Sequence, residues 1–317
     1  MNSSLASQVV VRISVLTPGP NGVVSGEEMW NPNTPISEDC LYLNIWVPED
    51  VLLGSELSPL LVWIYGGGYM TGTSTLEVYD ADILSAMTGE VPGLLTGLLT
   101  ALSTAGLIVC SLQYRVGAFG FFYLGKEEAP GNMGLYDQAM ALQWIKDNIK
   151  SFRGDGEEIT LFGESAGAGS VSTHLISPIS RNIPKRAVLQ SGAINAPWSN
   201  LAPEKSRQIS EKLIADCDCQ RETERETMRC MRHLPAKNIS VAQWNSYLGI
   251  LGFPSSPTVD GEFLPRDPWE MLKDGDFSHV ELMMGTNQDE GLCRPLTSQT
   301  RIIKTYNFVS CSALLPN

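Results

Sequence analysis

The chain has 317 residues, of which 43% are hydrophobic, and its formal net charge is -13. This length and hydrophobic content are sufficient for a large core, in one big domain or two ordinary ones. The negative charge argues against binding to nucleic acid or to an anionic membrane surface; it is compatible with attraction of a small cation, or simply with an acidic, soluble surface.

The first 26 residues show little periodicity, and no structure is predicted for them. Val9 to Val11 form an apolar run, but it is short and Arg12 interrupts it, so we recognise no signal peptide. The first clear element is Leu41 to Val47, whose alternation is typical of a half-buried strand. Leu60 to Tyr65 is a continuous apolar run, which predicts a strand covered on both faces in a parallel sheet.

A stretch without charge lies between Glu90 and Arg115 and is nominally long enough to span a bilayer. One proline and three glycines interrupt it, and its second half, Leu107 to Leu112, is typical of a core strand. We therefore favour a soluble protein over a membrane span.

Strands and helices then alternate to residue 285. The predicted elements are a helix over 132–152, a strand over 159–163, a strand over 186–191, an amphipathic helix from Pro203 carrying Ile209 and Leu213, a short helix over 268–274 and a strand over 281–285. This order predicts an α/β fold with a mostly parallel sheet and right-handed crossovers.

The pattern GESAG, Gly163 to Gly167, follows one of these strands directly. It matches GxSxG, in which glycines allow a sharp strand-to-helix turn that exposes a nucleophilic serine, here Ser165. A Gly-rich turn that contains a serine by chance is the plainer alternative. Gly66 to Gly68 end another strand and are placed to offer N–H groups to an oxyanion, with Ala166 as a further donor. A tight turn or a phosphate loop would also fit these glycines, although no GKS/T sequence is present.

A serine nucleophile also needs a histidine and a carboxylate, in the chain order serine, acid, histidine. Glu290 lies in a loop after the strand over 281–285 and could be the acid. The three histidines, His174, His233 and His279, all precede it. We interpret each of them as a core or surface residue rather than a catalytic base.

Two features concern covalent modification. Cys219 and Cys230 flank a short polar segment, as a loop-closing disulfide would in a secreted protein, although two free thiols remain an alternative. Asn2 and Asn238 begin N-glycosylation sequons, which matter only in a chain that enters the secretory pathway.

Several further motifs carry a family resemblance. They are SEDCLYLNIW (37–46), WIYGGGYMTGTSTLEVYDAD (63–82), QYRVGAFGF (113–121), EAPGNMGLYDQ (128–138), FGESAG (162–167) and QSGAINAPW (190–198). Together they resemble the type-B carboxylesterases, which have the α/β-hydrolase fold. EMWNPN (28–33) and WNSYLGILGFPSSPTVDGEFLP (244–265) narrow the resemblance to the arthropod acetylcholinesterases within that family.

The resemblance implies a serine esterase that hydrolyses acetylcholine without a cofactor, in an extracellular or synaptic cell-surface location. By position it implies Ser165 as nucleophile, Glu290 as triad acid, Gly67, Gly68 and Ala166 as oxyanion hole, Trp30, Tyr79 and Glu164 around the choline group, Trp198 and Phe253 as acyl-pocket walls, and Trp244 at the mouth of the site. A general carboxylesterase and a non-catalytic cholinesterase-like binding protein are the alternative functions.

The chain also departs from the family pattern. We expect a partial hydrolase domain over 27–291, an insertion at 91–106 and a divergent tail over 292–317, which contains no Asp or Glu. Cys40 lacks the family's upstream partner cysteine and is expected to be unpaired. The family's catalytic histidine and C-terminal dimerisation segment have no counterpart, so we expect this chain to hydrolyse choline esters weakly or not at all.

Overall fold

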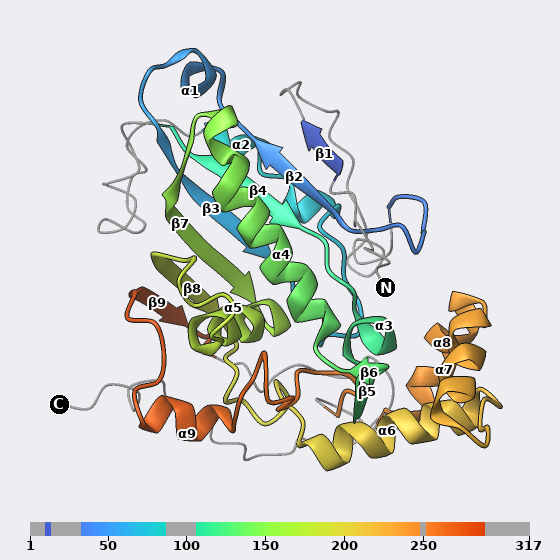
Figure 1. The fold of residues 1–317 in the computed structure, drawn as a ribbon. Helices are drawn as coiled ribbons and strands as arrows, with labels where there is room; N and C mark the ends of the chain where they lie inside the picture. The colour runs from blue at the N-terminus through green and yellow to red at the C-terminus, as the bar shows by residue number, and fades with distance from the viewer. Residues whose placement is uncertain (1–9, 14–32, 87–105, 248–251, 289–317) are drawn as a thin grey trace, which may run out of the picture.

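The computed structural model describes residues 10–13, 33–86, 106–247 and 252–288 (Figure 1). Trp30, Glu290, the tail over 292–317 and all but the last residue of the expected insertion lie outside the described residues.

A mixed, mostly parallel sheet forms the centre of the molecule. Its seven strands are, in spatial order, β1 Val10–Ile13, β2 Tyr42–Trp46, β4 Ile108–Leu112, β3 Ser58–Ile64, β7 Gly154–Glu164, β8 Arg186–Gln190 and β9 Glu281–Gly285. Only the β2–β4 pair is antiparallel among these neighbours. The predicted α/β class and every predicted strand are confirmed, whereas β1 was not predicted. A separate two-stranded sheet joins β5 Tyr123–Lys126 to β6 Ala129–Pro130.

Helices cover the sheet and extend beyond one end of it. They are α1 Glu49–Leu53, η2 Glu77–Tyr79, α2 Asp82–Ala86, α3 Gly117–Phe121, α4 Met133–Asn148, η3 Ile149–Phe152, α5 Ala166–Ile176, α6 Pro203–Asp216, α7 Glu224–His233, α8 Ala236–Ala242, η4 Gln243–Ser246 and α9 Pro268–Lys273, where η marks a 3-10 helix. The predicted helices at 132–152, 203 onward and 268–274 are confirmed. No helix in the described ranges has the length and apolar character needed to cross a membrane.

The main core lies between α4 and the sheet, across which α4 runs in Figure 1. Leu142 and Ile145 of α4 are completely buried, as are Leu60 and Val62 of β3. All five residues of β4 are buried, as expected for a strand inside the sheet, while β3 alternates between buried and half-buried positions. The apolar run over 60–65 therefore marks a strand that is fully covered on one face and half covered on the other.

The helices α6, α7 and α8 gather at one side of the molecule, around a second core (Figure 1). Leu213 of α6 and Met231 of α7 pack there beside a disulfide between Cys219 and Cys230. The expected disulfide is thus present, and it closes the loop between α6 and α7. Cys40 is a free cysteine, as expected.

The parallel register places several chain segments at one edge of the sheet. Ile64 of β3 lies beside Gly163 of β7, Glu164 beside Gln190 of β8, and Gln190 beside Gly285 of β9. Because parallel strands point the same way, the segments that follow them emerge together. The glycine run, Ser165 and the loop that leads towards Glu290 all begin at this edge.

Candidate active site

Ser165 occupies a strained turn between β7 and α5. Its φ of 56° and ψ of -121° lie outside the regions that a serine normally adopts, so the surrounding packing must enforce them. The backbone N–H of Ser165 donates a hydrogen bond to the Gln190 carbonyl at 2.8 Å, and its carbonyl accepts from Gly169 N at 2.9 Å. This is the strained strand-to-helix turn that the GxSxG pattern predicts.

The two glycines of the elbow permit close contact between α5 and the sheet. A Cβ on Gly167 would lie 2.0 Å from the Ile64 carbonyl oxygen, and a Cβ on Gly163 would lie 2.5 Å from the Gly167 carbonyl carbon. Larger residues at either position would push the helix away from the strands. The close contact that these glycines allow therefore determines the position of Ser165 relative to the end of β3.

The glycine run forms a loop beside the serine. Gly67 and Gly68 have φ values of 115° and 62°, and a Cβ on Gly66 would lie 3.1 Å from the Cβ of Ser165. The Gly67 carbonyl accepts hydrogen bonds from the following turn, while the N–H groups of Gly67 and Gly68 donate to no acceptor among the described residues. Ala166 begins α5, so its N–H has no acceptor within the helix. Three backbone donors are thereby available close to Ser165, as oxyanion stabilisation requires.

Tyr69 connects the glycine loop to the rest of the site. Its side chain is fully buried, its φ is 59°, and its ring packs edge-on against Phe121. Its hydroxyl lies 3.3 Å from the Ser199 hydroxyl, next to Trp198, which packs against the cluster that contains Tyr69 and Ala166. Burial raises the pKa of Tyr69 to about 12, so the hydroxyl stays protonated. Sequence reasoning identified Trp198 but missed Tyr69, although it directly follows the glycine run.

Glu164 and Tyr79, the two described residues expected around a cationic group, lie near each other. Burial and, to a smaller extent, the negative charge of Glu164 raise the pKa of the Tyr79 phenol. Trp63 of β3 supports this side, with ring centroids 5.2 Å from Tyr79 and 4.8 Å from Phe162. Asn33, three residues after Trp30 in the sequence, is hydrogen-bonded to the loop before Tyr79. Its side-chain amide donates to the Thr75 carbonyl and accepts from the Thr75 hydroxyl.

A row of aromatic rings leads from the surface to the glycine loop. The ring of Trp244 is 5.7 Å from that of Tyr247, which is 5.8 Å from that of Phe253. Phe253 in turn covers Gly68, because a Cβ on this glycine would lie 2.6 Å from its ring. The side chains of Trp244 and Tyr247 are 41% and 40% exposed. Phe253 and Trp244 thus lie at the inner and outer ends of this row of rings. Tyr247 lies between them and was not predicted from the sequence.

The segment expected to carry the acid begins next to the elbow. Ser191, which follows β8, donates its N–H to the Gly285 carbonyl at 2.8 Å, and Gly285 ends β9. Two consecutive backbone hydrogen bonds therefore connect Ser165 through residues 190–191 to the end of β9. Glu290 itself follows five residues later, outside the described part of the chain.

None of the three histidines is placed as a base for Ser165. His174 is fully buried in α5, with Nδ1 at 2.7 Å from the Ser180 hydroxyl and Nε2 at 3.0 Å from Oε1 of Gln138. It lies nine positions after Ser165 in the sequence, which corresponds to about 13 Å along the helix. Burial lowers the pKa of His174 to about 3, so the ring is neutral at pH 7. His233 and His279 are exposed, the first bonded to its own helix and the second against Phe277.

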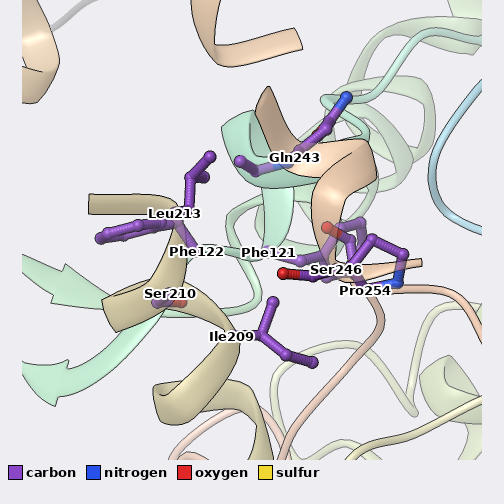
Figure 2. Close-up of a pocket in the computed structure, with 10 residues that line it drawn as sticks. Phe121, Phe122, Ile209, Ser210, Leu213, Gln243, Ser246 and Pro254 are labelled. Atoms are coloured by element: carbon purple, nitrogen blue, oxygen red, sulfur yellow. The ribbon is translucent and has the colours of Figure 1, made fainter. Parts of the chain in front are cut away.

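A small crevice lies elsewhere, between α3, α6 and η4 (Figure 2). Phe121, Ile209, Leu213 and Pro254 line it, and Ser165 is not part of it. Phe121 separates it from Tyr69, since the two rings pack against each other. In the described ranges no group of three or more His, Cys, Asp or Glu side chains is arranged to hold a metal ion.

The chain is similar to known carboxylesterases and acetylcholinesterases. The Carboxylesterase family profile matches residues 17–308. The chain is 51% identical over 285 residues to an acetylcholinesterase of Leptinotarsa decemlineata, covering 84% of this chain and 43% of the relative. Acetylcholinesterases of Bungarus fasciatus and Danio rerio are 44% and 41% identical over 269 residues, covering 84% of this chain and 41% and 39% of those relatives. The chain thus spans about two fifths of the length of these relatives. With its α/β sheet, its serine elbow and this match, the chain belongs to the carboxylesterase family.

Proposed function

We propose that the chain derives from a serine esterase that hydrolyses acetylcholine through an acyl-serine intermediate. The observation that carries the proposal is the strained backbone of Ser165 beside the N–H groups of Gly67 and Gly68, which have no acceptor among the described residues. A strained backbone costs free energy and persists only where the surrounding structure enforces it, which is common at functional sites. In acyl transfer this conformation would present the serine hydroxyl to the substrate.

In the proposed reaction the Ser165 hydroxyl attacks the ester carbonyl carbon and loses its proton to a base. The carbonyl oxygen becomes an oxyanion, which Gly67, Gly68 and Ala166 stabilise through their N–H groups; one such donor contributes about 3 kcal/mol. The ester C–O bond then breaks and choline leaves with a proton. Water attacks the acetyl-serine in the second half-reaction and releases acetate.

The cationic end of the substrate is assigned to the side of Glu164 and Tyr79, with Trp30. A quaternary ammonium has no hydrogen to donate, so aromatic faces hold it, each contributing about 0.5–2 kcal/mol. The nearby carboxylate of Glu164 adds attraction, in keeping with the electrostatic effect of Glu164 on Tyr79. The acetyl end is assigned to the side of Trp198 and Phe253. The names of the relatives support this choice of substrate.

We further propose that the 317-residue chain turns over weakly or not at all. An unactivated serine hydroxyl is a weak nucleophile, and removing the triad histidine of a serine hydrolase costs many orders of magnitude in kcat. His174 is buried with both ring nitrogens hydrogen-bonded, and His233 and His279 make contacts elsewhere. Glu290 is assigned as the acid that would orient such a base.

The test is turnover of acetylthiocholine and of phenyl acetate by the purified chain, beside Ser165→Ala. We expect the unsubstituted chain to hydrolyse both esters at rates close to those of Ser165→Ala. Any rate above that of Ser165→Ala should be greater for acetylthiocholine, the cationic ester, than for phenyl acetate. Rapid turnover of acetylthiocholine would refute the expected weak activity. An excess confined to phenyl acetate would favour a general carboxylesterase.

A further inference from the structure

We propose that Asn238 is an N-glycosylation site, which carries an oligosaccharide on the outer face of α8. Asn238-Ile239-Ser240 has the Asn-x-Ser pattern with a middle residue other than proline. The other sequon begins at Asn2, outside the described residues. The inference concerns α8 and requires no activity at Ser165.

The two faces of α8 differ in a way that suits such a modification. Ile239 and Ala242 face inward and pack against the core shared by α6 and α7. Asn238, Ser240 and Val241 are exposed. In Figure 1, α8 lies at the outer margin of the molecule, away from the central sheet. The acceptor amide and the hydroxyl two residues later are therefore both open to solvent.

The Asn238 carboxamide makes no hydrogen bond with the described residues. Asn132, by contrast, is completely buried and its amide group both donates to and accepts from Thr258. A carboxamide used in this way contributes to the fold and is inaccessible to an enzyme. That of Asn238 has no such structural partner, so a sugar attached there disturbs no described contact.

The core beneath α8 indicates the compartment. The Cys219–Cys230 disulfide belongs to the cluster against which Ile239 packs. Disulfides form and persist in the endoplasmic reticulum lumen and outside the cell, and are rare in the cytosol. N-glycosylation of Asn-x-Ser sequons marks the surface of proteins that pass through the same secretory route. The disulfide and the exposed sequon are thus two separate features that suit the same environment.

The transfer itself is chemically simple. The amide nitrogen of Asn238 forms a bond to the anomeric carbon of a sugar carried on a lipid pyrophosphate. The bond from that carbon to the pyrophosphate oxygen breaks, the lipid pyrophosphate leaves with the electron pair, and the amide gives up one proton. Val241, which is 64% exposed and one turn further along the same face, would then lie beneath the first sugars.

The experiment expresses the full chain behind a cleavable secretory leader in eukaryotic cells, with Asn2→Gln as background. Leader cleavage reports entry into the lumen, and intact mass is compared before and after peptide N-glycosidase. We expect a mass increase that the glycosidase removes, leaving an aspartate at position 238. Asn238→Gln and Ser240→Ala should abolish it, while Ser240→Thr, which preserves the sequon, should retain it.

A chain with its leader removed and no sugar at Asn238 would overturn the proposal. So would a glycosidase-sensitive mass that survives in Asn238→Gln.

Discussion

The contact between α5 and the end of β3 predicts a large effect of a small change, Gly167→Ala. The added Cβ would lie 2.0 Å from the Ile64 carbonyl oxygen and 2.9 Å from the Tyr65 carbonyl carbon. Both are backbone atoms at the end of β3 or directly after it, so no flexible side chain can move aside. A contact more than 1 Å too short must displace α5, and overpacking of this kind costs about 1–3 kcal/mol. We expect the upper end, about 3 kcal/mol less free energy of unfolding.

The assay is urea unfolding followed by circular dichroism, with Gly285→Ala as the matched control. A Cβ on Gly285 meets no atom of the described residues within 4 Å, and its φ requires no glycine. The control should therefore match the unsubstituted chain within about 0.5 kcal/mol. If Gly167→Ala also stays within that range, α5 is not held against β3 as described, and the argument for the position of Ser165 fails.

Three further predictions concern a buried hydroxyl pair, the buried histidine of α5 and the disulfide. Tyr69→Phe and Ser199→Ala should each cost about 1 kcal/mol of unfolding free energy, and the double variant should cost little more than either; additive losses would show that the two hydroxyls do not interact. Burial lowers the pKa of His174 to about 3 in the folded chain, whereas the unfolded chain protonates this residue below about pH 6.5. Because the unfolded state then binds the extra proton, His174 lowers the free energy of unfolding as the pH falls, by up to about 1.4 kcal/mol per pH unit. His174→Gln should weaken that dependence between pH 6.5 and 5 in urea titrations, and an unchanged slope would contradict the assignment. Replacing Cys219 and Cys230 by serine opens a loop of 11 residues and should cost about 3 kcal/mol in the same assay, whereas a loss below about 1 kcal/mol would contradict the entropic estimate.

The elements with simple local patterns were predictable from sequence. Runs such as 60–65 and 107–112 are apolar because their strands are buried. The GESAG pattern predicts the sharp turn at Ser165 because a strained serine requires small residues beside it. The helix α7 was missed because it is highly charged and buries little more than Met228 and Met231. Its local signals are present: Thr223 accepts a hydrogen bond from the Glu226 N–H as an N-cap, and Met228 and Met231 lie on one face, but the segment was interpreted as a polar loop between Cys219 and Cys230.

The arrangement of the site depended on contacts that local patterns cannot reveal. Tyr69 and Ser199 are 130 residues apart, and Phe253 covers Gly68 from an even greater separation along the chain. The antiparallel direction of β2 was equally hidden, since alternation indicates a strand but not its orientation. The sequence predicts the candidate site residues, and the register of the sheet places the ends of β3, β7, β8 and β9 side by side.

We propose that Ser165 lies in an oxyanion site next to a site for a cation. This proposal is tested most directly by phosphonylation of the purified chain with two matched phosphonates, one carrying a choline leaving group and the other its neutral 3,3-dimethylbutyl isostere. Intact mass and peptide mapping give the rate and the position of the adduct, with Ser165→Ala as control. We predict slow modification at Ser165 alone, faster with the cationic reagent and absent from Ser165→Ala. Equal rates for the two reagents would contradict the cation site, and an adduct that persists in Ser165→Ala would contradict the nucleophile.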